Sequence, residues 1–479
     1  MSSLNTAFKK KLHQCRPRHE PAEIQTRVSR NRTKNVLCDP ASLERDVRQR
    51  LADKVSGNLA GIWLLIAEHL RLGTWDLLCG WTGHSAECVE PRLALQLVHE
   101  AAVCTTGIRS QRTLASRGGF ELANGLPFVG SDKAIHDLLE EHTVADSMRL
   151  QVALGSIRRA SGDFQAKLLA IDPHRTRSYS KRHMREHVEQ KGDKPVKMAQ
   201  TFWVLDADTH QPVCFTTATA ARTVATATPE LVDLAQSILQ PAPGQVLIVA
   251  DSQHYAHELI ADIYDRTGFD LLVPIPSQRV HRERFKAIPA DQFTRRWAGF
   301  ATAKLPYEVE ARKTGHCRYW QFVERFGERP EDWRFKGFLS TTDRDEVDAL
   351  TLEYPKRWHV EEFFNANQSL GWKRAGTANI NIRYGQMTMA LIAQAAIHQL
   401  RKRLGSPYSS WDATHLSQDL FFALEGDVRV TRDTIVITYY NAPDQLQRHY
   451  ENLPDQLTQE SVKPEIPWLY NYKLDFRFR

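Results

Sequence analysis

The sequence lacks long apolar runs. Hydrophobic residues make up 42% of the chain, yet no stretch approaches the ~20 consecutive apolar residues of a membrane-spanning helix. The first residues, MSSLNTAFKKKLHQ, also lack the apolar segment of a secretory signal peptide. We therefore expect a soluble, cytoplasmic protein. A Gly-rich phosphate loop is missing too, so no nucleotide cofactor is expected.

Cysteine is scarce and unevenly placed. The seven cysteines are odd in number and scattered, which argues against a disulfide framework. Cys79, His84, Cys88 and Cys104 could be combined into a zinc site, but their spacing fits no common zinc-finger pattern. Buried free thiols are the alternative, because free cysteine is commonly a core residue.

The positive charge is concentrated at the start of the chain. Residues 1–35 hold nine Lys and Arg against two Glu, whereas the whole chain carries a net charge of only +6. Residues 1–42 are polar and lack sustained periodicity, so we expect a basic flexible arm that contacts phosphates. A disordered solubilising tail would have the same composition.

Residues 43–160 show helical patterns. The apolar run 59–81, the amphipathic run 91–103 and the segment 148–160 predict helices, and Ser131 or Asp132 should cap another that ends near His142. A glycine-containing turn with several cations nearby (Arg109, Arg112, Arg117 and Lys133) suggests an all-α, helix-turn-helix-like DNA-binding domain. Any helical bundle has such turns. At 479 residues, two or three domains are expected in the whole chain.

From 161 to 275 strands alternate with helices. Strands are predicted at 168–172, 201–207, 211–219, 245–251 and 269–275, and helices at 228–240, with Thr228 as cap and Pro229 in the first turn, and at 253–268. This is the α/β element order of the ribonuclease H-like fold, a mixed sheet with flanking helices. Its first and fourth strands lie side by side, so Asp172 and Asp251 should meet.

The segment Tyr354–Leu370, YPKRWHVEEFFNANQSL, predicts a helix that begins at Pro355. At the helical period, Val360, Phe363, Phe364 and Leu370 share one face. Glu361 borders that face and Glu362 points away from it. A plain surface helix with an Arg357–Glu361 pair is the alternative.

Two Asp at strand ends and a Glu on a later helix supply hard oxygen ligands for Mg²⁺ or Mn²⁺. The order Asp172, Asp251, Glu361, with the Glu inside Tyr-x-x-Arg-x-x-x-Glu, resembles the DDE transposases of bacterial insertion sequences. The likeness is to the insertion sequence 4 type, which carries a Tyr-Arg-Glu-Lys signature. Gln368 stands at the signature lysine, and Lys373 follows five residues on.

The resemblance implies a ribonuclease H-like core at 161–275 and 351–405, interrupted by a β-rich insertion at 276–350. Two Mg²⁺ or Mn²⁺ ions would be held by Asp172, Asp251 and Glu361. Residues expected to contact DNA are Tyr354 and Arg357 at the phosphate beside the cut end, Trp358 on a displaced base unless it is core, and Gln368 or Lys373 at the strand end. The insertion supports this, because its fourteen Lys and Arg between 277 and 341 are interleaved with aromatics.

Several rival residues remain. His174 could assist proton transfer or simply pack, Asp206 and Asp208 lie at a predicted hairpin turn, and Glu362 neighbours Glu361. In the C-terminal segment, 406–479, we expect a helix at 411–424, a hairpin near 427–440, a second helix at 442–451 and a final strand, with a partner contact as one use.

The function implied by the resemblance is transposition of an insertion sequence. The protein would bind the terminal inverted repeats of its element, cleave, and transfer the strand to target double-stranded DNA. Cut-and-paste through a hairpin intermediate, by a homodimer in a synaptic complex at the bacterial nucleoid, would follow. A ribonuclease H-like nuclease or repair enzyme and a catalytically silent, domesticated DNA-binding protein are the alternatives.

Overall fold

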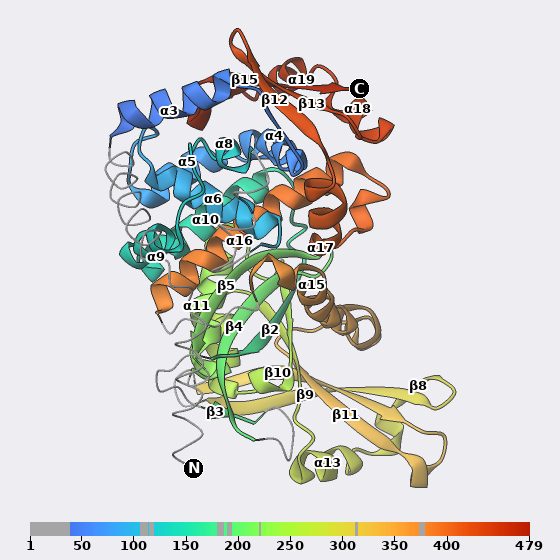
Figure 1. Ribbon diagram of the computed structural model, residues 1–479. Coiled ribbons are helices and arrows are strands. Elements are labelled where there is room, and N and C mark those ends of the chain that lie inside the picture. Colours follow the sequence, from blue (N-terminus) through green and yellow to red (C-terminus); the bar gives the residue numbers. More distant parts are fainter. Residues whose placement is uncertain are drawn as a thin grey trace, which may run out of the picture.

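The computed structural model describes residues 39–105, 114, 119–179, 186–188, 194–219, 222–311, 315–372 and 379–479. Figure 1 shows an elongated molecule with three layers along its length. The N-terminal helices and the C-terminal segment lie together at one end, a mixed sheet occupies the middle, and a β-rich extension forms the other end.

The N-terminal part is a helical bundle. Its helices are α3 (Pro40–Ala52), α4 (Leu64–Arg71), α5 (Thr74–Thr82), α6 (Glu90–Ala102), α8 (Phe120–Ala123), α9 (Asp132–Glu141) and α10 (Val144–Ala160). The predicted run 59–81 is split because Gly73 takes a left-handed conformation with φ 59°. Ser131 caps α9 as predicted and accepts a hydrogen bond from the Ala134 N–H at 3.3 Å.

Two boundaries of this region differ from expectation. Helix α3 begins at Pro40, inside the expected arm 1–42, because Asp39 accepts a hydrogen bond from the Ala41 N–H at 3.1 Å and caps the helix. The region 43–160 is also not purely helical. Strand β1 (Val55–Gly57) pairs with β12 (Gly426–Thr431), a partner too distant in sequence for a local pattern to reveal.

The central sheet has the predicted strand order. Its strands are β2 (Leu168–Arg177), β3 (Glu186–His187), β4 (Val196–Asp206), β5 (Gln211–Thr219), β6 (Leu247–Ala250) and β7 (Asp270–Pro274). β5, β4 and β2 are antiparallel neighbours, and β6 and β7 continue the sheet parallel to β2. The first and fourth predicted strands, β2 and β6, therefore lie side by side, with Ile171 opposite Ala250.

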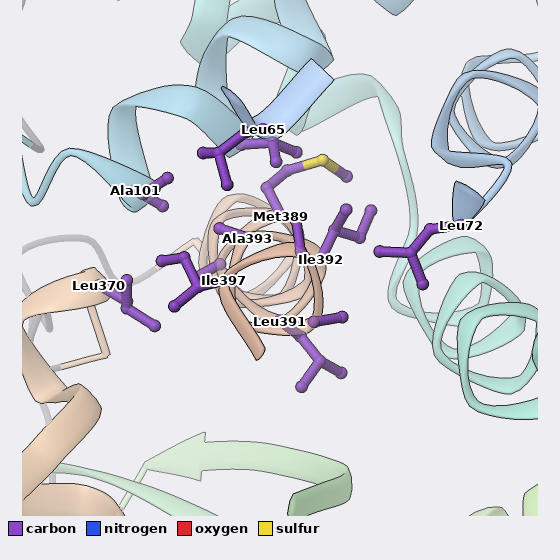
Figure 2. Close-up of a cluster of buried hydrophobic side chains, with 14 of the residues drawn as sticks. Leu65, Leu72, Ala101, Leu370, Met389, Leu391, Ile392, Ala393 and Ile397 are labelled. Atoms are coloured by element: carbon purple, nitrogen blue, oxygen red, sulfur yellow. The ribbon is translucent and has the colours of Figure 1, made fainter. Parts of the chain in front are cut away.

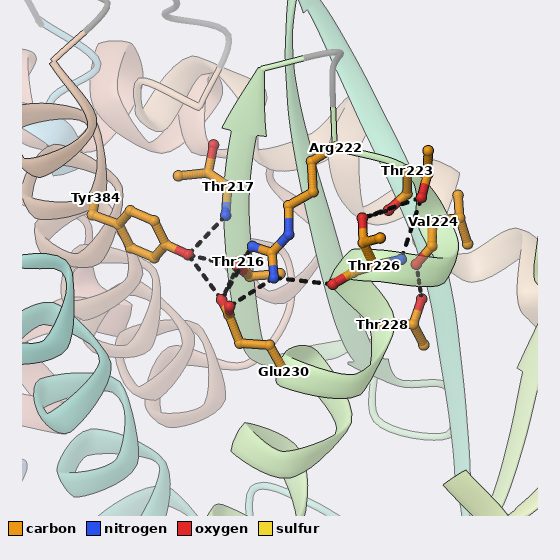
Figure 3. A network of polar contacts seen from close by, with 9 residues as sticks. All are labelled: Thr216, Thr217, Arg222, Thr223, Val224, Thr226, Thr228, Glu230 and Tyr384. Atoms are coloured by element: carbon orange, nitrogen blue, oxygen red, sulfur yellow. Dashed lines mark hydrogen bonds and ion pairs between the residues drawn. The ribbon is translucent and has the colours of Figure 1, made fainter. Parts of the chain in front are cut away.

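Two helices accompany this sheet, α11 (Val224–Leu239) and α12 (His257–Thr267). The predicted start of α11 at Thr228 is wrong by one turn. Thr223 is the cap, accepting from the Thr226 N–H at 3.3 Å, and Pro229 lies inside the helix. Figure 3 shows how α11 is tied to the sheet and to α16 (Ile380–Leu404): Glu230 accepts from Arg222 at 2.7 Å and from Thr216 of β5 at 2.5 Å. The Thr216 and Tyr384 hydroxyls lie 2.5 Å apart.

The β-rich extension continues the same sheet. It contains α13 (Arg279–Lys286), β8 (Thr294–Trp297), β9 (Phe300–Ala311), β10 (Gly315–Phe326) and β11 (Arg334–Ser340). β11 pairs antiparallel with β7, with Leu339 opposite Val273, so the extension is anchored to the core through hydrogen-bonded strands. It lies in the chain where the β-rich insertion was expected.

Helix α16 runs through the centre of the molecule. Figure 2 shows Met389, Leu391, Ile392, Ala393 and Ile397 of this helix surrounded by Leu65, Leu72, Ala101 and Leu370. All nine are buried, so this part of α16 packs against neighbouring residues on several sides of the helix. In the described part of the chain, no helix combines the length and the apolar character needed to cross a membrane.

The C-terminal segment packs on the N-terminal helices. It contains α17 (Ala413–Leu416), a π-helical stretch (Ser417–Phe422), β12, β13 (Thr434–Tyr439), α18 (Asp444–Tyr450), α19 (Leu453–Gln459), β14 (Glu465–Ile466) and β15 (Tyr472–Phe478). The predicted final strand is present and runs parallel to β13. Helix α19 was not predicted. Trp468 is fully buried and donates to the Ala123 carbonyl at 2.9 Å.

Candidate active site

Two neighbouring strands, β2 and β6, bring the two Asp residues to one place in the sheet, although the predicted end of the first strand at Asp172 is wrong because β2 continues to Arg177. Asp172 lies within β2 opposite Trp203, and Asp251 follows directly after the last residue of β6. Ile171 and Ala250, which precede them, are register partners. Both runs are apolar because the core buries these stretches of β2 and β6 on both faces, and the sequence turns polar at Asp172, in the middle of β2, and at Asp251, after β6.

Glu361 is supplied by a helical segment that is longer than predicted. The chain is helical from Glu346 to Leu370: α14 (Glu346–Asp348), a π-helical turn η5 (Ala349–Glu353), a 3₁₀ turn η6 (Tyr354–Trp358), α15 (His359–Asn367) and η7 (Gln368–Leu370). The predicted start at Pro355 is therefore wrong, and Tyr354 itself has helical angles. Proline has no backbone N–H to donate within a helix, and the π-helical turn before Pro355 and the 3₁₀ turn containing it accommodate this residue without ending the helical segment.

The face that Glu361 borders is the predicted one. Val360, Phe363 and Phe364 are buried, and the rings of Phe363 and Phe364 lie 5.8 and 6.0 Å from the ring of Trp203 on β4. Glu361 is partly exposed at the rim of this contact, whereas Glu362 is exposed. Packing of the aromatic face on the sheet therefore turns Glu361, and not Glu362, toward the strand ends.

Arg357 bridges the helix and the sheet. Its Nη1 lies 3.1 Å from Asp172 Oδ1, and its Nη2 lies 3.3 Å from Glu361 Oε1. The i,i+4 Arg–Glu pair foreseen for a surface helix exists, but the same guanidinium also holds an acid on β2. The Arg357 and Asp172 side chains are 16% and 18% exposed, so their ion pair is largely shielded from solvent, whereas Glu361 is 37% exposed.

The charges of the three carboxylates affect one another. Burial raises the pKa of Asp172 to about 7, and the charges of Asp251 and Glu361 push it in the same direction, while Arg357 opposes them. A carboxyl group with this pKa beside two other acids is typical of a functional site. The negative charge concentrated there favours a cation.

Asp251 is fixed by its own loop. Its Oδ1 accepts the Gln253 N–H at 3.0 Å and lies 2.8 Å from His254 Nδ1. Burial by itself would raise the pKa of Asp251, but the His254 hydrogen bond and charge outweigh it and the net pKa is lowered. His254 is 1% exposed, and its Nε2 has no hydrogen-bond partner among the described residues. The sequence alone gave no sign of this support.

A second cation comes from the insertion. The Lys336 Nζ of β11 lies 5.1 Å from the centre of the Tyr354 ring and 4.6 Å from that of Phe338. Burial lowers the pKa of Lys336, Glu324 opposes that effect, and the charge of Arg357 lowers it further. The pKa of Tyr354 is raised, mainly by burial, with Asp251 and Asp172 close enough to add to it. Tyr354 and Arg357 therefore lie beside the acids, and Lys336 lies beside Tyr354.

The other residues predicted to contact DNA are Trp358, Gln368 and Lys373. Trp358 is 55% exposed, so it is not a core residue, and the Arg357 guanidinium lies 5.9 Å from its ring. Gln368 follows α15 directly in η7 and is partly exposed. Lys373, like Arg109, Arg112 and Arg117, lies outside the described residues.

The rival acids and His174 have structural partners. Asp206 is fully buried and accepts three backbone N–H groups, from Ala166 at 2.8 Å, Asp208 at 3.1 Å and Thr209 at 3.0 Å. Asp208 pairs with Lys356 at 2.5 Å. The His174 ring stacks on Phe364 with 4.2 Å between centroids. These contacts explain the three residues as parts of the hairpin turn and of the helix–sheet packing.

The donor set fits hard divalent cations. Asp172, Asp251 and Glu361 offer carboxylate oxygens from two strands and a helix, and their mutual repulsion would be relieved by a cation. In the described part of the chain, one group of possible metal ligands has all its ligand atoms within 4.8 Å of one another: His84, Cys88 and Glu90. The carboxylates of Asp172, Asp251 and Glu361 lie further apart than that in this conformation. Arg357 lies between Asp172 and Glu361.

Two comparisons show what this chain is similar to. No curated protein matches the sequence. A solved structure described as "Cryo-EM structure of piggyBac transposase synaptic complex with hairpin DNA" is similar at 13% identity and a TM-score of 0.40, over 75% of this chain and 79% of that one. Residues 163–395, which hold Asp172, Asp251 and Glu361, match the family model described as Transposase DDE domain.

Proposed function

We propose that the protein is an insertion-sequence transposase of the insertion sequence 4 type. It binds the terminal inverted repeats of its element, cleaves there, and joins the freed 3′-hydroxyl to target DNA. The observation that carries this proposal is that Asp172 from β2 and Glu361 from α15 share the guanidinium of Arg357, while Asp251, at the end of β6, lies close enough to Asp172 to raise its pKa.

Asp172, Asp251 and Glu361 would hold two Mg²⁺ or Mn²⁺ ions. When bound, such ions activate a water or a 3′-hydroxyl and neutralise charge at phosphorus during in-line displacement. The chain's part is to hold its carboxylates in place. The sheet fixes Asp172, the loop hydrogen bonds of Gln253 and His254 fix Asp251, and the aromatic face of α15 fixes Glu361.

The cations beside the acids bind the DNA backbone. Arg357 has donors enough to exchange its contact with Glu361 for a phosphate oxygen, and Lys336 and the Tyr354 hydroxyl extend the same positive rim. Gln368 and Lys373 position the strand end. The exposed Trp358 ring, next to Arg357, is available for stacking on a displaced base.

The parts of the chain outside the catalytic core bind the DNA duplex and join two subunits. The basic arm and the N-terminal helical domain bind the terminal repeats, and two subunits form a homodimeric synaptic complex with the C-terminal segment as one contact. Cleavage proceeds by cut-and-paste through a hairpin on the transposon end. The protein acts in the bacterial cytoplasm, at the nucleoid.

Cleavage of a labelled duplex that carries the element's own terminal repeat tests this proposal. Purified wild-type protein with Mg²⁺ or Mn²⁺ should give a nick at the repeat boundary, then a hairpin, then joined product, and EDTA should abolish all three. Asp172→Asn should bind the duplex without cutting it. Cutting of any duplex without joining would favour the nuclease alternative, and binding without cutting by the wild type would favour a silent DNA-binding protein.

A further inference from the structure

The loop between α5 and α6 gathers three different metal-binding side chains. The possible ligand atoms of His84, Cys88 and Glu90 all lie within 4.8 Å of one another. His84 Nδ1 and Glu90 Oε2 are 3.9 Å apart. This cluster lies in the N-terminal helices, outside the transposase domain at 163–395.

A buried arginine, Arg92, donates hydrogen bonds to the backbone of the loop that carries these side chains. Arg92 is 1% exposed, and its Nη1 donates to the carbonyls of Ala86 and Cys88, each at 2.7 Å. Gly83 ends α5 in a left-handed conformation with φ 68°. The Thr82 hydroxyl accepts the His84 N–H at 3.4 Å. The backbone under the cluster is therefore fixed before any ligand arrives, which lowers the ordering cost of binding.

The donor set selects a class of ion. One thiol sulfur, one imidazole nitrogen and one carboxylate oxygen suit a borderline-soft divalent ion, and Mg²⁺ and Ca²⁺ prefer oxygen alone. The 3.9 Å between His84 Nδ1 and Glu90 Oε2 is near the ligand–ligand separation of a tetrahedral site, about 3.5 Å from the bond lengths. Small side-chain rotations would close the set, because His84 is exposed and Cys88 and Glu90 are partly exposed.

We propose that His84, Cys88 and Glu90 form a zinc site that clamps the end of α5 to the start of α6. This differs from the four-residue set considered from the sequence, because Cys79 is not part of the group whose ligand atoms lie within 4.8 Å of one another, and Cys104 lies elsewhere. Its Sγ is 3.4 Å from both the Ser369 hydroxyl and the Ala413 carbonyl.

The clamp adjoins the contact between the two ends of the chain. Arg92, which supports the loop, also donates to the Trp468 carbonyl at 3.3 Å, and the Trp75 and Trp468 rings lie 5.5 Å apart. An ion at this loop would therefore stabilise the packing of the C-terminal segment on the N-terminal helices. Its effect is on stability and does not depend on DNA cleavage.

Cobalt substitution in the full-length, reduced protein tests the site. Co²⁺ bound at Cys88 should give a thiolate-to-metal charge-transfer band, which the all-carboxylate set of Asp172, Asp251 and Glu361 cannot give. Zn²⁺ should displace the Co²⁺ and raise the Tm. Cys88→Ser should lose the band, and His84→Ala should weaken Co²⁺ binding by more than about tenfold, the minimum expected even for an outer-shell residue.

Two controls separate this site from other thiols and from the transposase centre. Cys104→Ser and Asp172→Asn should both keep the band, and a far-UV circular dichroism spectrum like that of the wild type should confirm that each variant folds. The proposal is overturned if the wild type shows no band under saturating Co²⁺, if Cys88→Ser keeps it, or if Cys104→Ser removes it.

Discussion

Arg357 is the residue on which the electrostatics of the site depend. A single guanidinium faces Asp172 at 3.1 Å and Glu361 at 3.3 Å, and it opposes the rise in the pKa of Asp172 that burial causes. It also ties the 3₁₀ turn containing Pro355 to strand β2. The same side chain therefore fixes the register of the helix against the sheet and keeps two acids close to one another.

His254 is the positioning residue for Asp251. We predict that His254→Phe lowers the cleavage rate by about ten- to a hundredfold, because it removes a hydrogen bond to Asp251, which we propose as a metal ligand. His254→Asn, whose amide can replace the Nδ1–H, should retain more activity. Single-turnover cleavage rates and DNA affinity measure the two effects separately. Equal loss in both variants, or loss of DNA binding with unchanged rate, would show that His254 does not act through Asp251.

At the scale of elements, strand β11 links the insertion to the site through Lys336. We predict that Lys336→Ala weakens DNA binding. The slope of log K, the DNA association constant, against log salt concentration should fall by about one, as expected for the loss of one phosphate contact. Lys336→Arg should preserve the slope. Lys463→Ala, an exposed lysine of the C-terminal segment, is the matched control. An unchanged salt slope for Lys336→Ala would remove Lys336 from the DNA contact.

Helices α4 and α6 bury a histidine pair. Burial lowers the pKa of His99 to about 4 and the pKa of His69 also well below its usual value, with 5.0 Å between the rings. The unfolded chain, with a histidine pKa near ~6.5, therefore binds more protons than the folded one between about pH 4 and 6.5. Stability is complete above that window and falls as the pH is lowered through it.

The expected loss from His99 is up to about 3 kcal/mol at pH 4. Urea unfolding between about pH 4 and 7.5 measures it, and His99→Gln should flatten the pH dependence, whereas His136→Gln, at an exposed position, should not. A wild-type free energy of unfolding that stays constant across this range would contradict the burial of a neutral pair.

At the scale of the whole molecule, the two ends of the chain form one folded unit. β1 pairs with β12, and Trp468 is buried against Trp75 and the Ala123 carbonyl. We predict that Trp468→Ala destabilises the protein by about 3–5 kcal/mol, since a fully buried indole and its hydrogen bond are removed. Thermal unfolding followed by helical circular dichroism measures it.

Trp297→Ala is the matched control for that variant, because Trp297 is 50% exposed and belongs to β8, which lies in the extension at the other end of the molecule (Figure 1). It should leave the Tm nearly unchanged. If Trp468→Ala did the same, the C-terminal segment would not be part of the N-terminal core.

The central sheet was predictable because its information is local. Apolar runs end at Asp172 and Asp251, and the strand–helix order determines that β2 and β6 are neighbours. The face of Glu361 followed from the helical period. The starts of the helices near Pro355 and Thr228 were not predictable in the same way, since a π turn and the Thr223 cap override the usual meaning of proline.

The remaining features depend on contacts between distant residues. Lys336 reaches Tyr354 only because β11 joins the central sheet beside β7, and the β1–β12 pair joins positions near opposite ends of the chain. His254 was hidden because a histidine three residues after a ligand has no fixed meaning in sequence. Such long-range pairings follow from tertiary packing and leave no periodic signal.

The most direct test of the account compares Glu361→Gln with Glu362→Gln in Mn²⁺-dependent cleavage of the element's terminal repeat. The two residues are adjacent on α15, but only Glu361 pairs with Arg357, and Glu362 is exposed. We predict that Glu361→Gln abolishes cleavage and retains DNA binding, and that Glu362→Gln cleaves like the wild type. Full cleavage by Glu361→Gln would contradict the assignment of the three acids.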